Sequence, residues 1–128
     1  MSRVSYLLVT DLNALSSWAN EVGSIFHTDI EPYGLYLVGS SLNKPDFRDV
    51  DVRHILSNDD FLKLYSVIDV GYFNHAMSLW GQKTTGLPID YQIQPIDSPD
   101  NNGPKNSLDA LDGYINSRKR LIMQGGKS

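Results

Sequence analysis

Apolar residues recur every three or four positions between Leu12 and Phe26, which is the spacing of one face of an α-helix. We expect Asp11 to be the N-cap of this helix, because a short acidic side chain accepts hydrogen bonds from free backbone N–H groups. The apolar run Ser5–Thr10 before it fits either a strand or the lead-in to the helix. The residues of the predicted buried face are Leu12, Leu15, Trp18, Ala19, Val22, Ile25 and Phe26.

A second helical period begins after Ser57, which we predict to be an N-cap with acidic residues in the turn that follows it. The period continues past Gly71, which should weaken the helix, and ends before a predicted loop at Gly81–Pro88. We therefore expect one long helix. Its predicted face consists of Phe61, Leu64, Tyr65, Ile68, Tyr72, Ala76 and Leu79.

Three shorter runs have the pattern of β-strands. Leu35–Val38 is a compact apolar run, whereas Asp49–Ile55 and Ile89–Pro95 alternate polar and apolar residues as half-buried strands do. After them, Ile96–Ser107 is dense in turn residues and is predicted to be a linker. Leu108–Met123 could form a final helix before a frayed tail.

This order of elements predicts a small α+β (α/β) fold, in which helices pack against a small mixed β-sheet. At 128 residues the chain is long enough to bury one core, so we expect a single domain. Residues 1–95 would form its core, and residues 96–128 the linker and a C-terminal extension of the same domain.

The composition narrows the class of protein. A net charge of −4 argues against a general nucleic-acid coat or a membrane-surface protein, since both are usually basic. The chain has no cysteine, which excludes disulfides, thiolate metal sites and cysteine nucleophiles. The N-terminus is a poor signal peptide, and no run approaches the roughly 18 apolar residues of a membrane span. We therefore expect a cytoplasmic protein with no membrane contact.

Two carboxylates alternate with two valines at the start of the Asp49–Ile55 strand. Asp49 and Asp51 share one face of that strand, with Cα atoms about 6.6 Å apart, and they repel each other unless a cation lies between them. The oxygen ligands suit a hard cation such as Mg²⁺, or Mn²⁺. Asp90, on the polar face of the Ile89–Pro95 strand, would complete a metal site for two ions.

A glycine-serine turn ends the Leu35–Val38 strand. Gly39 allows a tight turn, after which the backbone N–H groups and the hydroxyls of Ser40 and Ser41 can face an anion. Ser41 could instead cap the turn. A phosphate-binding turn beside a cation-binding carboxylate pair predicts a site for a nucleoside triphosphate with its magnesium.

The motif "VGSSLNKPDFRDVDV", followed by "PIDYQI" in a later strand, resembles the DNA polymerase beta-like nucleotidyltransferase superfamily, and especially its small members. The resemblance implies a nucleotidyltransferase-like core, with Gly39 and Ser40 at the triphosphate of ATP or another NTP. It implies that Asp49, Asp51 and Asp90 ligate two Mg²⁺ or Mn²⁺ ions and are the catalytic residues. Such enzymes transfer a nucleoside monophosphate to an acceptor hydroxyl and release pyrophosphate.

The sequence leaves the acceptor open as a small molecule, a tRNA or a protein. The short region after the third strand keeps a second reading open: a catalytically inactive nucleotide-binding protein of the same fold. A third reading is a partner-interaction protein, for example a toxin-antitoxin or host-interaction module. The basic cluster Arg118–Arg120 could be a solvated helix end or a nucleic-acid contact.

Other polar and aromatic residues have simpler predicted roles. Arg48 and Arg53 would neutralise the acidic pair, or one of them could reach a substrate phosphate. The three histidines lack a metal-ligand spacing, so each is predicted to be structural or exposed. The aromatic residues predicted to belong to the core rather than to a base-stacking surface are Tyr65, Tyr72 and Phe73.

Overall fold

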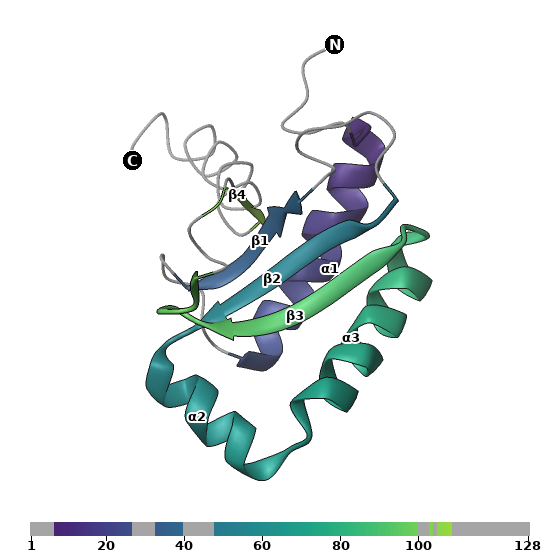
Figure 1. Ribbon diagram of the computed structural model, residues 1–128. Helices are drawn as coiled ribbons and strands as arrows, with labels where there is room; N and C mark the ends of the chain where they lie inside the picture. The colour runs from purple at the N-terminus through teal and green to yellow at the C-terminus, as the bar shows by residue number, and fades with distance from the viewer. Residues whose placement is uncertain (1–6, 27–32, 40–47, 100–102, 104, 109–128) are drawn as a thin grey trace, which may run out of the picture.

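The computed structural model of the chain describes residues 7–26, 33–39, 48–99, 103 and 105–108. Within these ranges three helices and four strands follow one another along the chain (Figure 1). The helices are α1 (Val9–Phe26), α2 (Asn58–Val67) and α3 (Val70–Thr85). The strands are β1 (Gly34–Val38), β2 (Val50–Leu56), β3 (Ile89–Pro95) and β4 (Lys105–Ser107).

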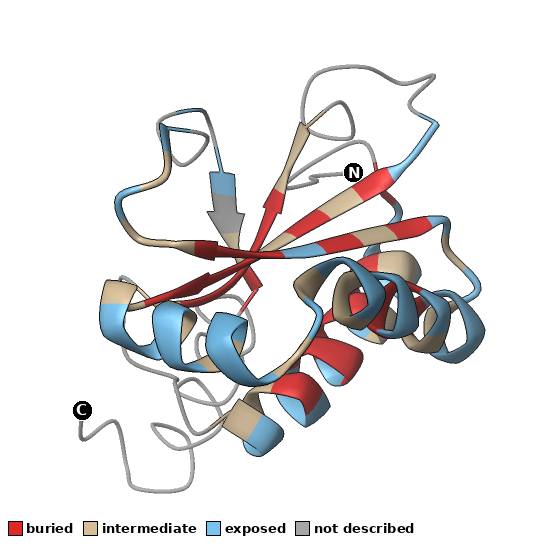
Figure 2. Cartoon of the chain, turned by 60° about the horizontal axis from the view of Figure 1, so that its bottom comes forward, coloured by how far each residue is buried: buried red, intermediate tan, exposed pale blue. Residues whose placement is uncertain are grey.

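The strands form one mixed sheet in the order β3-β2-β1-β4. β1 pairs with β2 and with β4 in the antiparallel sense, whereas β2 and β3 are parallel. Parallel neighbours need a crossover, and α2 with α3 supplies it. The helices lie on one side of the sheet (Figure 2), which leaves its other face free of helices among the described residues. The predicted small α+β fold with helices packed on a mixed sheet is therefore confirmed.

The core lies between the sheet and helices α1 and α3. Val50 and Val52 of β2 point into it and are fully buried, as the alternating pattern predicted. Trp18 stands at its centre, with its ring edge-to-face against Trp80 and Tyr91. Of the predicted α1 face, most residues are buried or pack against the core, but Ile25 is 61% exposed because it lies at the helix margin.

The start of α1 differs from the sequence prediction. The helix begins at Val9, so Asp11 lies inside the first turn and is not the N-cap. Its charge there still suits the positive end of the helix dipole. The last part of Ser5–Thr10 is therefore the lead-in to a helix, with Leu7 buried in the core.

The single long helix predicted after Ser57 is wrong. Ser57 does cap α2 by accepting a hydrogen bond from the Asp60 N–H, but the backbone becomes extended at Ile68. Asp69 then starts α3, because its Oδ1 atom accepts from the Tyr72 N–H at 3.1 Å. This break rotates the second half of the predicted face. Tyr72 is 77% exposed and Tyr65 is 62% exposed, so both were wrongly predicted as core.

The predicted loop at Gly81–Pro88 is also wrong in its first half, because α3 continues to Thr85. The glycine that ends the helix is Gly86, which adopts the left-handed conformation at φ 73°. Gly81 lies inside the helix, where it packs against Trp18. A Cβ atom there would lie 2.8 Å from Cζ2 of Trp18 and 3.1 Å from Cγ2 of Ile89. The missing side chain lets α3 approach the buried indole closely.

We expect Gly81→Ala to destabilise the protein by about 1–3 kcal/mol, because the added methyl must displace the fully buried Trp18 ring. Gly23→Ala is the matched control, since it lies in α1 with no atom within 4 Å of the new Cβ. That change should stabilise by roughly 0.5–1 kcal/mol, because alanine restricts the unfolded chain. Urea denaturation measures both. Equal, stabilising effects of the two changes would contradict the close packing of α3 on Trp18.

Part of the predicted linker Ile96–Ser107 belongs to the sheet. Lys105–Ser107 forms β4 and pairs with β1, with Lys105 opposite Val38. Three residues are too few to show an alternating pattern in the sequence. Beyond Leu108, the predicted final helix, the cluster Arg118–Arg120 and the tail lie outside the described residues.

Across the described part of the chain, no helix has both the length and the apolar character needed to cross a bilayer.

Candidate functional site

Two of the three predicted catalytic carboxylates are direct neighbours across β2 and β3. Asp51 is the register partner of Asp90. Register partners point to the same face of a sheet, and here their neighbours Val50, Val52 and Ile89 are buried on the helix side. The two carboxylates therefore share the face that the described helices do not cover. The predicted metal site depends on this pairing of Asp51 with Asp90, which are far apart in the sequence.

Asp49 stands at the entrance to the same site. It precedes β2 and is exposed, and the next residue along, Val50, donates its N–H to the Pro88 carbonyl just before β3. Asp49 and Asp90 line one cavity. The negative charge of Asp49 also raises the pKa of the Asp51 carboxyl. The structure thus pairs Asp51 with Asp90 and places Asp49 near enough for its charge to act on Asp51, at one end of the parallel strand pair.

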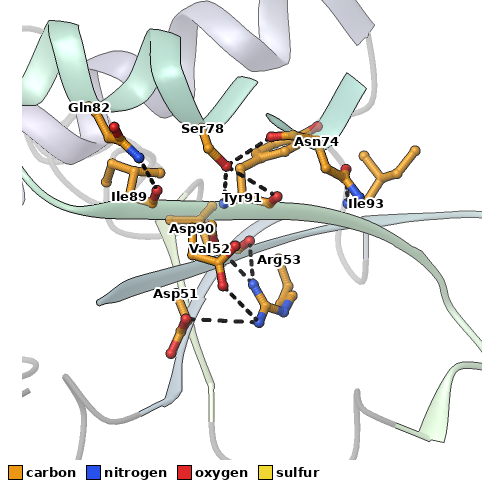
Figure 3. A network of polar contacts seen from close by, with 10 residues as sticks. All are labelled: Asp51, Val52, Arg53, Asn74, Ser78, Gln82, Ile89, Asp90, Tyr91 and Ile93. Atoms are coloured by element: carbon orange, nitrogen blue, oxygen red, sulfur yellow. Dashed lines mark hydrogen bonds and ion pairs between the residues drawn. The ribbon is translucent and has the colours of Figure 1, made fainter. Parts of the chain in front are cut away.

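Arg53 lies beside the two paired carboxylates and forms an ion pair with each (Figure 3). Its Nη2 atom is 3.9 Å from Oδ1 of Asp51 and 3.9 Å from Oδ2 of Asp90. Its Nη1 atom donates to the backbone carbonyls of Val52 and Asp90, at 3.1 Å each. The guanidinium is thus held by the backbone, and it meets the carboxylates at ion-pair distance rather than hydrogen-bond distance. Of the two roles predicted for Arg53, the position fits charge neutralisation.

The electrostatics of Asp51 reflect this crowding. Partial burial raises the pKa of the Asp51 carboxyl, and the nearby charges of Asp90 and Asp49 and a hydrogen bond with the Asp90 side chain raise it further. The Arg53 guanidinium acts in the opposite direction on that pKa, but does not cancel the rise. A carboxylate in this situation gains from a further cation, because the added charge offsets both desolvation and repulsion.

Gly39 follows β1 directly and lies against Asp51. Its backbone is left-handed, with φ 79°, a conformation that glycine adopts without strain. An added Cβ would collide with the Asp51 carboxylate and stand 2.9 Å from its Cγ atom. The predicted phosphate-binding turn therefore begins beside the predicted metal-binding pair. Ser40 and Ser41, the other predicted phosphate ligands, lie outside the described residues.

We expect Gly39→Ala to destabilise the protein by more than Gly86→Ala does. Both glycines are left-handed, so each substitution carries the backbone cost of about 1–2 kcal/mol. Only at Gly39 does the new methyl also meet another side chain, that of Asp51, because nothing lies within 4 Å of a Cβ at Gly86. Denaturant titration of the two variants gives the difference. Identical losses would contradict the contact between Gly39 and Asp51.

The three aspartates offer carboxylate oxygens, the ligand type that a hard cation prefers. Their mutual repulsion, seen in the raised pKa of Asp51, also favours a bound cation. Among the described residues, no three or more His, Cys, Asp or Glu side chains are already grouped so that they could hold a metal ion. Asp51 and Asp90 are the closest pair of predicted ligands, and Asp49 is the exposed third. A bound Mg²⁺ would therefore keep much of its coordination shell for water and phosphate oxygens.

A residue that the sequence did not single out completes the row across the sheet. The register runs Asp90, Asp51, Val38, Lys105 over the four strands. With strands about 4.8 Å apart, the Cα atom of Lys105 lies about 10 Å from that of Asp51. The Lys105 Nζ atom is 5.5 Å from the centre of the Tyr36 ring, on the same face. The sequence placed Lys105 in a predicted linker, because a strand of three residues is too short to show an alternating pattern.

Polar side chains of α3 hold the outer edge of β3 (Figure 3). Ser78 Oγ accepts from the Tyr91 N–H at 2.9 Å, and Asn74 Oδ1 accepts from the Ile93 N–H at 3.1 Å. Gln82 Nε2 donates to the Ile89 carbonyl at 3.0 Å. The three α3 residues recur every four positions, which is a signal that sequence reasoning could have used. Their bonds satisfy the free edge of β3, the strand that carries Asp90.

Of the two described histidines, His54 lies in the core and His75 lines the cavity beside the carboxylates. His54 is fully buried, with its Nδ1 atom 2.7 Å from the Tyr91 hydroxyl oxygen, so its predicted structural role is confirmed. His75 is exposed on α3, and His27 lies outside the described residues. Arg48 is exposed at the edge of the described segment.

A scan against protein-family models, a search of curated proteins and a search of solved structures each gave no match to this chain. The function proposed below therefore rests on its residues and on their arrangement.

Proposed function

We propose that this protein is a metal-dependent nucleotidyltransferase that acts on cytoplasmic nucleoside triphosphates. The observation that carries the proposal is the pairing of Asp51 with Asp90 on parallel neighbouring strands, with Gly39 in contact with Asp51. Three segments far apart in the sequence thus contribute two carboxylates and a left-handed glycine to one point. Separately, each of these features is common in proteins that bind no nucleotide.

The reaction would be an in-line displacement at the α-phosphorus of the nucleotide. The acceptor oxygen forms a bond to that phosphorus, the bond to the bridging oxygen of the β-phosphate breaks, and pyrophosphate leaves. Asp90, the more exposed of the two paired carboxylates, takes the proton of the acceptor hydroxyl. Asp49, Asp51 and Asp90 would hold Mg²⁺, which supplies charge stabilisation for the phosphate oxygens when it is bound.

Lys105 fits the phosphates that leave. It lies on the sheet face of Asp51, about 10 Å away and beyond Gly39, so the triphosphate would extend from the carboxylates toward it. The Tyr36 ring below its ammonium group keeps the side chain on this face. An ammonium group acts on phosphate as a point charge and does not need bidentate geometry.

We expect Lys105→Ala to weaken the binding of an NTP about tenfold, and that of the matching NMP far less, because the lost charge faces the β- and γ-phosphates. Lys83→Ala, at an exposed position in the last turn of α3, is the control and should change neither affinity. Equilibrium binding of fluorescent nucleotides measures all four values. An equal loss for NTP and NMP would place Lys105 away from the terminal phosphates.

The proposal is tested by group transfer. The protein is incubated with α-labelled NTPs, Mg²⁺ or Mn²⁺, and cell extract as the source of acceptors. We expect label to be transferred by the wild type and lost with Asp51→Asn. Absence of transfer, together with unchanged metal and nucleotide affinity in Asp51→Asn, would overturn it.

The position of Arg53 favours a second candidate, a nucleotide-binding protein without transfer. Its guanidinium already lies 3.9 Å from both paired carboxylates and offsets part of their charge without a metal ion. In that case a nucleotide binds equally well with and without EDTA, and no pyrophosphate appears. Binding that requires Mg²⁺ would decide for the transferase.

A further inference from the structure

A polar cavity of about 480 Å³ lies along the outer edge of β3, between that strand and α3. Its volume falls within the range of sites for small molecules. It adjoins the candidate site, since Asp49 and Asp90 are part of its wall. The other lining residues are Gly71, Asn74, His75, Ser78, Gln82, Ile89, Tyr91 and Gln92.

The wall on the α3 side is held in place by its own hydrogen bonds. Asn74 uses its amide oxygen, and Gln82 its amide nitrogen, to bind the backbone of β3 (Figure 3). Within the described residues, these bonds do not use the Asn74 amide nitrogen or the Gln82 amide oxygen. Each side chain thus has a fixed orientation and one unused polar group, which is the arrangement of a hydrogen-bonding site for a ligand.

The cavity lies on the side of the carboxylates where an acceptor must enter. In-line displacement requires the attacking and leaving oxygens to stand on opposite sides of the phosphorus. Gly39 and Lys105 lie on one side of Asp51, toward β1 and β4. Asp90 and the cavity lie on the other side, at the outer edge of β3. The predicted place of the terminal phosphates, near Lys105, and the cavity, near Asp90, are thus at opposite ends of the register Asp90, Asp51, Val38, Lys105.

The charged residues described in the cavity wall are acidic, which disfavours an anionic ligand. Two carboxylates, Asp49 and Asp90, are part of the wall, and none of its described lining residues is a lysine or arginine. Its other polar groups are amides, a hydroxyl and the exposed His75. Nucleic-acid sites instead carry basic side chains along the phosphate backbone, because those charges supply most of the affinity.

We infer that this cavity binds the acceptor, and that the acceptor is a small hydroxyl compound without phosphate groups, uncharged or cationic, rather than a nucleic acid. This inference rests on the proposed function. The hydroxyl would reach the Asp90 carboxylate, which lines the cavity at the β3 edge, and the remaining polar groups of the ligand would meet Asn74, Gln82 and Gln92.

Three sugars of similar size and different charge test the inference: glucosamine, glucose and glucose 6-phosphate. Their affinities for the Mg²⁺–nucleotide complex of the protein are measured by ligand-observed NMR. We expect glucosamine to bind better than glucose 6-phosphate by at least about fivefold, with glucose between them. Gln92→Lys should narrow or reverse this order, because it places an ammonium group in the wall.

Asn13→Lys is the control, since it adds the same charge at an exposed position of α1 and should leave the order unchanged. Stronger binding of glucose 6-phosphate to the wild type, no binding of any of the three sugars, or competition by a short RNA would overturn the inference. Magnesium-dependent nucleotide binding is measured on the same samples. If it persists while the sugar order fails, only the acceptor assignment is wrong; if it is absent, the proposed function itself is wrong.

Discussion

Replacing Asp90 by asparagine is expected to lower the rate of nucleotidyl transfer by about 10²- to 10⁴-fold, the usual contribution of a positioned general base. The amide keeps the size of the side chain but cannot accept the acceptor proton. Asp90 is 43% exposed at the β3 edge, and its pairing with Asp51 sets its position. Nucleotide affinity should change less than the rate, because Asp51 and Gly39 remain. Release of labelled pyrophosphate and equilibrium nucleotide binding measure the two quantities.

Asp59→Asn provides the comparison for this variant. Asp59 is an exposed acid in the first turn of α2, so its replacement changes the net charge equally without touching the site. Its transfer rate should equal that of the wild type. A transfer rate for Asp90→Asn within a few-fold of the wild-type rate would remove Asp90 from the catalytic residues.

Acidification is expected to destabilise the protein through His54. Burial lowers the pKa of this imidazole from about 6.5 to about 3, so the folded protein holds it neutral. Between these values the unfolded chain binds a proton that the folded one does not. The free energy of unfolding therefore falls as pH drops from 6.5 to about 3, by up to about 1.4 kcal/mol per pH unit. The total loss from this one group is on the order of 5 kcal/mol, a large part of the stability of a small domain.

His54→Phe should remove this dependence, because a phenyl ring fits the aromatic contacts with Phe26 and Tyr91 but carries no proton. His75→Gln, at an exposed position, should keep the slope. Asp51 contributes in the opposite sense: its raised pKa makes the folded state bind more protons, so acidification stabilises through that group. Urea denaturation at pH 7, 6, 5 and 4 gives the slopes. Equal slopes for the wild type and His54→Phe would contradict a buried neutral imidazole.

The strands could be predicted because alternation within one strand is a local property. Val50 and Val52 are buried, and Asp51 lies on the opposite face, as their spacing implied. Which strands are neighbours is not local. The pairing of Asp51 with Asp90 depends on a parallel crossover through two helices, and no spacing along the chain encodes it.

The helices after β2 were predicted less well, for two physical reasons. The first helix ends before Ile68 and Asp69 caps the next one, and a single aspartate inside a helical pattern is weak evidence of a break. Gly81 looked like a helix terminator, but it is a packing residue beneath Trp18. Two site residues were found only in the structure. Lys105 reaches the site through the pairing of β4 with β1, and Gln82 through its hydrogen bond to the edge of β3.

The central claim is that Asp51, Asp90 and Gly39 together form a site for a nucleotide with its magnesium. Isothermal titration of a non-hydrolysable ATP analogue into the wild type and Asp51→Asn, each with and without Mg²⁺, tests it most directly. We predict that binding to the wild type requires Mg²⁺ and that Asp51→Asn weakens it at least about tenfold. Affinity that is the same with and without Mg²⁺, and the same in both proteins, would contradict the claim.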